Sequence, residues 1–97
     1  MSDRFSIKNK VIIITGAGRG IGKAFAEEFA KEDATVYAIS RSFSKMNNKK
    51  NNVHKIKCDV KNEKEFKKIC KKIFEIHKKI DVLINNAGIS LPQKNKE

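Results

Sequence analysis

The chain has 97 residues, 39% of them hydrophobic and 34% charged, with a formal net charge of +11 at pH 7, so it forms one domain or part of one. Its two cysteines and two histidines have neither C-x-x-C nor metal-ligand spacing, which argues against a disulfide framework and a zinc site. No stretch is apolar for the length of a membrane span and no signal-peptide core opens the chain, so we expect a cytoplasmic protein without a membrane partner.

Strands and helices alternate along the sequence. The predicted elements are strand 10–15, helix 20–31, strand 35–40, loop 41–52, strand 53–58, helix 62–79 and strand 82–85. This alternation indicates an α/β fold with a parallel sheet and right-handed crossovers. Loop 41–52 is short and rich in Asn and Lys, so it should hold at most one helical turn.

Each helix has an apolar stripe that should face the sheet. In the first helix the stripe comprises Ile21, Ala24, Phe25 and Phe29. In the second helix it comprises Phe66, Ile69, Cys70, Ile73 and Phe74, with Ile80 following. The second helix should begin at Asn62, which together with Glu65 forms a capping-box pair. Cys58 and Cys70 are expected to be small core residues in a reducing compartment.

The positive charge is concentrated in residues 41–79, which hold fourteen Lys or Arg against four Asp or Glu. These lysines could form a nucleic-acid surface or simply a solvated helix face. No aromatic residues alternate with them and no nucleic-acid motif is present. Specific nucleic-acid binding is therefore not expected.

A glycine-rich turn follows the first strand. Its sequence is Thr15-Gly16-Ala17-Gly18-Arg19-Gly20-Ile21-Gly22. Strand, glycine turn and helix in succession present backbone N–H groups and a helix dipole to a phosphate. The P-loop register fails at Ala17 and Ala24, and G-x-G-x-x-G fails at Ile21.

This T-G-x-x-x-G-x-G spacing resembles that of the short-chain dehydrogenases/reductases. Asp59-Val60 after the third strand and Asn85-Asn86-Ala87-Gly88 around the end of the fourth also match the family, and the resemblance covers residues 5–90. It implies a partial Rossmann-type doubly wound parallel sheet of strand order 3-2-1-4, with the cofactor between strands 1 and 4. It also implies that Asp59 and Val60 hold adenine, while Asn86, Ala87 and Gly88 line the ribose and brace the sheet.

The cofactor preference follows from charge at the end of the second strand. A carboxylate there would bind the ribose 2′-hydroxyl and exclude a 2′-phosphate, but this chain has Ser40 followed by Arg41. Arg19 can reach the same space, so we expect NADP(H) to be preferred over NAD(H), unless both arginines are only solvated. The predicted cofactor-binding residues are Gly16, Ala17, Gly18, Arg19, Gly20, Ile21, Gly22, Ser40, Arg41, Asp59, Val60, Asn86, Ala87 and Gly88.

No catalytic residue can be assigned in the 97 residues. The family's catalytic Ser, its Tyr-x-x-x-Lys pair and an assisting Asn follow the N-N-A-G segment, and the only tyrosine here, Tyr37, has no Lys four positions later. We therefore expect the N-terminal cofactor-binding portion, residues 1–97, of a reductase similar to those acting on 3-oxoacyl thioesters or other small carbonyls.

Two alternative functions remain open: a non-catalytic dinucleotide-binding module or partner subunit, and a basic protein that interacts with nucleic acid. In the expected strand order, strand 82–85 is an apolar edge that could pair with another chain. A complementing C-terminal half or a second copy of the chain would satisfy that edge.

We predict that purified residues 1–97 will not reduce carbonyl substrates with NADPH, because they supply neither the proton donor nor the Lys that lowers its pKa. NADPH consumption would be measured at 340 nm. Turnover above the buffer background that persists after re-purification would contradict the prediction.

Overall fold

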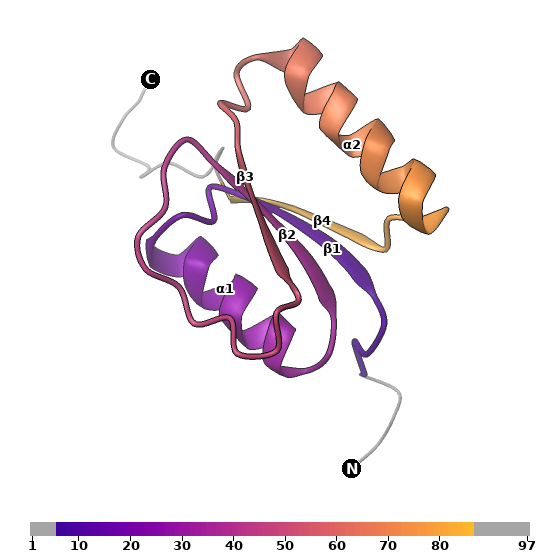
Figure 1. Ribbon diagram of the computed structural model, residues 1–97. Coiled ribbons are helices and arrows are strands. Elements are labelled where there is room, and N and C mark those ends of the chain that lie inside the picture. The colour runs from indigo at the N-terminus through magenta and orange to yellow at the C-terminus, as the bar shows by residue number, and fades with distance from the viewer. Residues whose placement is uncertain (1–5, 87–97) are drawn as a thin grey trace, which may run out of the picture.

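The computed structural model describes residues 6–86 and shows a four-stranded sheet with one helix on each face (Figure 1). All three strand pairings are parallel and the order is β3-β2-β1-β4, which confirms the predicted fold class. In chain order the elements are β1 (Val11–Thr15), α1 (Gly20–Lys31), β2 (Thr35–Ser40), β3 (Val53–Lys57), α2 (Glu63–His77) and β4 (Val82–Asn85). Neither helix in this part of the chain is long and apolar enough to cross a membrane.

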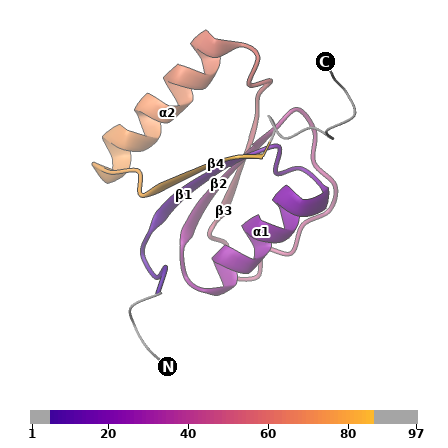
Figure 2. The same ribbon diagram turned by 180° about the vertical axis from the view of Figure 1, so that it is seen from behind.

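The two helices cover opposite faces of the sheet, as Figure 2 shows from behind. Alternate β1 residues contribute to separate cores: Ile12 and Ile14 pack with α1, while Val11 and Ile13 pack with Ile73 of α2. All five β1 side chains are buried. Each fully buried Ile contributes about 1.5–3 kcal/mol, so β1 is the centre of the hydrophobic core.

The predicted apolar stripe of α1 is wrong. The residues of α1 that are buried are Gly22, Ala26 and Ala30, whereas Ile21 is 69% exposed and Phe25 is 42% exposed. Small side chains allow the helix to approach the sheet closely, so the buried face is the one with the smallest residues. Ala24 is also exposed, and only Phe29 of the predicted stripe packs partly against the core.

Helix α2 begins as predicted at Asn62, whose side chain accepts a hydrogen bond from the Glu65 N–H at 3.2 Å. In a full capping box the Glu65 side chain would accept the Asn62 N–H. Here the Asn62 N–H donates instead to the Asp59 carbonyl at 2.8 Å. The helix ends at His77, and Lys78 follows in the left-handed conformation. Phe74 was expected on the buried face but is 51% exposed, so the α2 stripe is narrower than predicted.

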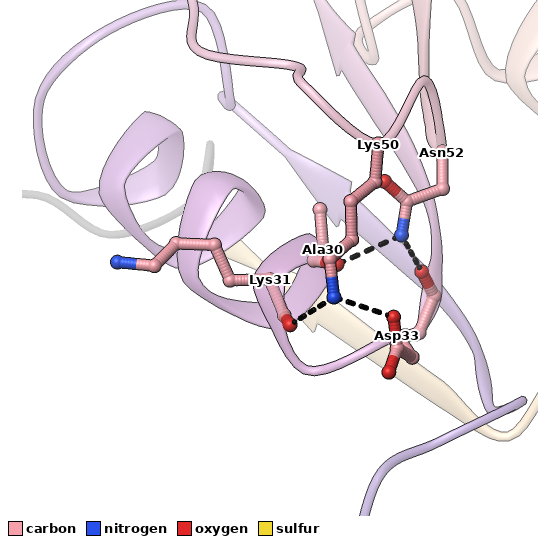
Figure 3. A network of polar contacts seen from close by, with 6 residues as sticks. Ala30, Lys31, Asp33, Lys50 and Asn52 are labelled. Atoms are coloured by element: carbon pink, nitrogen blue, oxygen red, sulfur yellow. Dashed lines mark hydrogen bonds and ion pairs between the residues drawn. The ribbon is translucent and has the colours of Figure 1, made fainter.

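The connection between β2 and β3, residues 41–52, contains no helix and is held by side chains that reach the end of α1 (Figure 3). Lys50 Nζ contacts the Lys31 carbonyl at 3.0 Å and the Asp33 carboxylate at 2.7 Å. Asn52 Nδ2 donates to the Ala30 carbonyl at 2.9 Å, and also to the Ala34 carbonyl. Of these acceptors, the Lys31 carbonyl belongs to the last turn of α1, whose final carbonyls have no partner within the helix.

Asp81 joins the start of β4 to the start of β1. Its carboxylate accepts the Val11 N–H at 2.7 Å and lies 3.2 Å from Lys79 Nζ, and its own N–H donates to the Val11 carbonyl at 2.9 Å. The hydrogen bond from the Val11 N–H lowers the pKa of Asp81 below its ordinary value. The nearby ammonium group of Lys79 lowers it further.

We predict that Asp81→Asn will lower the melting temperature at pH 7 and weaken the acid sensitivity of the fold. Because the folded pKa lies below the unfolded value of about 4, the carboxylate stabilises the protein above that pH. That stabilisation is lost as the pH falls through the folded pKa. Thermal melts between pH 2 and 7, with exposed Glu75→Gln as the control, would test this. Identical acid profiles for Asp81→Asn and the native chain would contradict it.

Candidate functional site

A cleft of about 650 Å³ lies at the carboxyl ends of the strands, within the size range of small-molecule sites. Its lining includes six of the residues selected from the sequence: Gly16, Arg19, Ser40, Arg41, Asp59 and Val60. Other lining residues are Ile39, Ser42, Cys58, Lys61 and Asn85. Open α/β sheets bind ligands at this edge, where the strand order reverses.

The glycine turn is braced by the end of β4. The Thr15 hydroxyl donates to Asn85 Oδ1 at 2.9 Å, and Asn86 Nδ2 donates to the Gly16 carbonyl at 3.1 Å. The Ala17 N–H donates to Ile39 O at 3.2 Å, which joins the turn to β2 as well. These bonds tie the glycine turn to the end of β4 and to β2.

The first turn of α1 is open to an anion. Arg19 is its N-cap and makes no side-chain capping bond, and the first turn contains no acidic residue. Gly20 has a φ of +62°, and no heavy atom lies within 4 Å of the place where its Cβ would be. Uncapped N–H groups and the helix dipole at such an end favour the binding of a phosphate.

Gly22 is required for a different reason, because it lies against the protein rather than against open space. A Cβ at this position would overlap the Gly16 carbonyl oxygen and lie 2.7 Å from Asn86 Nδ2. Six residues selected from the sequence are not among those that line the cleft: Ala17, Gly18, Gly20, Ile21, Gly22 and Asn86. Ala87 and Gly88, which were also selected, lie outside the described residues.

Positive side chains outnumber negative ones in the cleft. Arg19, Arg41 and Lys61 line it together with one carboxylate, Asp59, and this balance attracts anions. Arg19 Nη2 donates to Ser42 Oγ at 3.0 Å, and the Lys61 N–H donates to Asp59 Oδ1 at 3.0 Å. Sequence reasoning did not select Ser42 or Lys61. Each directly follows a selected residue, which is the signal that could have identified it.

Neither the thiols nor the tyrosine suggests a nucleophile or a general acid. Burial, with a smaller effect of Glu65, raises the pKa of the Cys58 thiol, and burial raises that of Cys70, so both remain protonated near neutral pH. The Tyr37 hydroxyl forms a 2.7 Å hydrogen bond with His77 Nε2 and does not line the cleft. Within residues 6–86, no three His, Cys, Asp or Glu side chains gather where they could hold a metal ion.

The sequence matches the family model described as short chain dehydrogenase over residues 10–97. The chain therefore belongs to the short-chain dehydrogenase family, which confirms the resemblance seen in its motifs. The members of that family are oxidoreductases with a Rossmann fold. Among curated protein sequences, none matches this chain significantly.

Several solved dehydrogenases are similar in structure. A short-chain dehydrogenase from Leptospira borgpetersenii with bound NAD⁺ is 31% identical with a TM-score of 0.78, over 89% of this chain and 34% of that protein. The 2-keto-3-deoxy-D-gluconate dehydrogenase of Streptococcus agalactiae is 33% identical with a TM-score of 0.73, over 97% of this chain and 39% of that protein. Thermoplasma acidophilum aldohexose dehydrogenase is 34% identical with a TM-score of 0.69, over 93% of this chain and 35% of that protein. The chain thus spans little more than a third of the length of each.

We predict that Gly22→Ala and Gly20→Ala will fail in different ways. Overpacking against Gly16 should lower the free energy of unfolding of Gly22→Ala by about 1–3 kcal/mol. Gly20→Ala should cost about 1–2 kcal/mol, for its left-handed backbone, and its methyl group would also enter the open space before α1. Urea titrations and dinucleotide binding would be measured on both variants.

Dinucleotide binding is compared at temperatures at which the two variants have the same free energy of unfolding. Under those conditions Gly20→Ala should bind the dinucleotide more weakly than Gly22→Ala does. If binding follows stability alone in both variants, the anion-binding role of the α1 N-terminus is contradicted.

Proposed function

We propose that this chain is the NADP(H)-binding portion of a short-chain reductase that transfers hydride between NADP(H) and a small carbonyl or alcohol substrate. The observation that carries the proposal is the position of Arg19 and Arg41 on the cleft, with Ser40 and no carboxylate at the end of β2. The bound nicotinamide would supply or accept the hydride. The residues of this chain would hold the cofactor and orient it.

The parts of the dinucleotide are assigned to separate groups of residues. Backbone N–H groups around Gly20 and the dipole of α1 would hold the pyrophosphate. By resemblance to the family, Asp59 and Val60 would contact adenine, and Asn86, with Ala87 and Gly88, would line the cofactor's ribose. The position of Asp59 and Val60 on the cleft supports the first of these assignments.

The preference for NADP(H) is a matter of charge. An acid at the position of Ser40 would repel a 2′-phosphate, whereas two guanidinium groups can form charge-assisted hydrogen bonds with it. The similar Leptospira protein was solved with NAD⁺, so the preference proposed here rests on the residues of this chain and not on that likeness.

The substrate and the catalytic step depend on residues other than those described above. We propose 3-oxoacyl thioesters as the first candidate substrates, because the sequence motifs resemble those of reductases that act on them. The two free cysteines fit a reducing compartment, so we place the protein in the cytoplasm.

We also propose that the edge of β4 pairs with a further polypeptide segment, either a complementing C-terminal half or a second copy of the chain. Leu83 is 53% exposed and Val82 is 39% exposed on this edge strand, and Phe74 and Ile76 of α2 are 51% and 68% exposed. Apolar edges of this kind are templates for strand pairing.

We predict that the chain will bind NADPH more tightly than NADH by roughly 1–3 kcal/mol, the contribution of charged hydrogen bonds to the 2′-phosphate. Arg41→Ala should remove most of that difference without changing the affinity for NADH. Isothermal titration with both cofactors would measure it, and Lys49→Ala, in the same loop but away from the cleft, is the control. Equal affinity of the native chain for the two cofactors would contradict the charge argument.

A further inference from the structure

The segment that leaves β2 folds back onto the glycine turn. The backbone N–H and the hydroxyl of Ser44 both donate to the Gly18 carbonyl, at 2.8 Å and 3.0 Å. Two residues earlier, the Ser42 carbonyl lies so close to Gly18 that a Cβ on residue 18 would overlap it. Two segments that are 26 residues apart in sequence are thus in direct contact beside the cleft.

The same contact includes Arg19. Its Nη2 donates to Ser42 Oγ at 3.0 Å, and both residues line the cleft together with Arg41. A guanidinium has five N–H donors, so a bond to one hydroxyl leaves others for a phosphate. The Ser42 bond therefore restricts the Arg19 side chain without using up its capacity to bind an anion.

The remainder of the loop is anchored independently of this contact. Phe43 and Met46 pack against the core on the α1 side, and the Asn47 N–H donates to the Glu27 carboxylate at 2.7 Å. Lys50 and Asn52 attach the far end of the loop to the C-terminal end of α1 (Figure 3). The two serines can therefore be changed while the loop keeps its other attachments.

We propose that Ser42 and Ser44 are positioning residues for the 2′-phosphate of NADP(H), because they clamp segment 41–44 to the glycine turn and hold the Arg19 guanidinium at the cleft. The inference rests on the proposed NADP(H) function. Ser44 does not line the cleft, so it acts through position and not by contact with the cofactor. Arg19 and Arg41 supply the charge, and the serines reduce the conformational freedom that binding would otherwise remove.

The test measures the ratio of the dissociation constants for NAD⁺ and NADP⁺, by isothermal titration of the full chain. Ser42→Ala and Ser44→Ala should each reduce this ratio by about two- to tenfold, the effect of freeing one long side chain. The affinity for NAD⁺, which lacks the 2′-phosphate, should not change. Ser44→Thr keeps a hydroxyl and should restore the ratio, and Lys49→Ala is the loop control.

A double-mutant cycle tests whether Ser42 acts through Arg19. In an Arg19→Ala background, Ser42→Ala should have no further effect on the ratio. A persisting effect would overturn the positioning role, as would equal weakening of NAD⁺ and NADP⁺ binding in the single variants.

The failure of the inference and the failure of the proposed function give different results. If the native chain prefers NADP⁺ and both serine variants keep that preference, the inference is overturned and the proposed function stands. If the native chain binds the two dinucleotides equally, the NADP(H) proposal itself is overturned and the inference falls with it.

Discussion

The structure depends on the close approach of the first turn of α1 to the end of β1. Gly22 lies against the Gly16 carbonyl, and Asn86 donates to that same carbonyl from beyond β4. No larger side chain fits at residue 22 without moving the turn. The approach brings the uncapped end of α1 to the carboxyl edge of the sheet, where its N-cap residue Arg19 lines the cleft. A single packing constraint therefore serves both the fold and the proposed anion site.

The central position of β1 gives the glycine turn its support. Its side chains are buried on both faces, by α1 on one side and by α2 with Ile73 on the other. Parallel strands covered on both faces read as continuous apolar runs, and residues 11–14 are such a run. Backbone bonds to β2 and β4 hold both edges of β1, so the glycine turn extends from a strand that is paired on both sides and buried on both faces.

Sequence reasoning succeeded where local spacing determines structure and failed where packing decides. The glycine spacing, Asn62 and the apolar runs identified the elements and, with the family resemblance, the strand order. The buried stripe of α1 was predicted wrongly because Phe25 is the more hydrophobic side chain. The helix instead packs closely against the sheet through the smaller Ala26. The approach of Ser42 and Ser44 to Gly18 could not be predicted, because it joins segments far apart in the sequence, partly through backbone atoms that any residue carries and partly through the Ser44 hydroxyl.

The contacts also separate cofactor binding from cofactor choice. The groups proposed to hold the pyrophosphate belong to the backbone of a turn fixed by core packing, so they are insensitive to most substitutions. The groups proposed to select a 2′-phosphate are side chains on the exposed segment after β2 and on Arg19, joined to the fold by a few hydrogen bonds. Changes on that segment can alter the preference without disturbing β1 or α1. Discrimination between the two dinucleotides is therefore expected to be the most easily changed property of this site, and general dinucleotide binding the least.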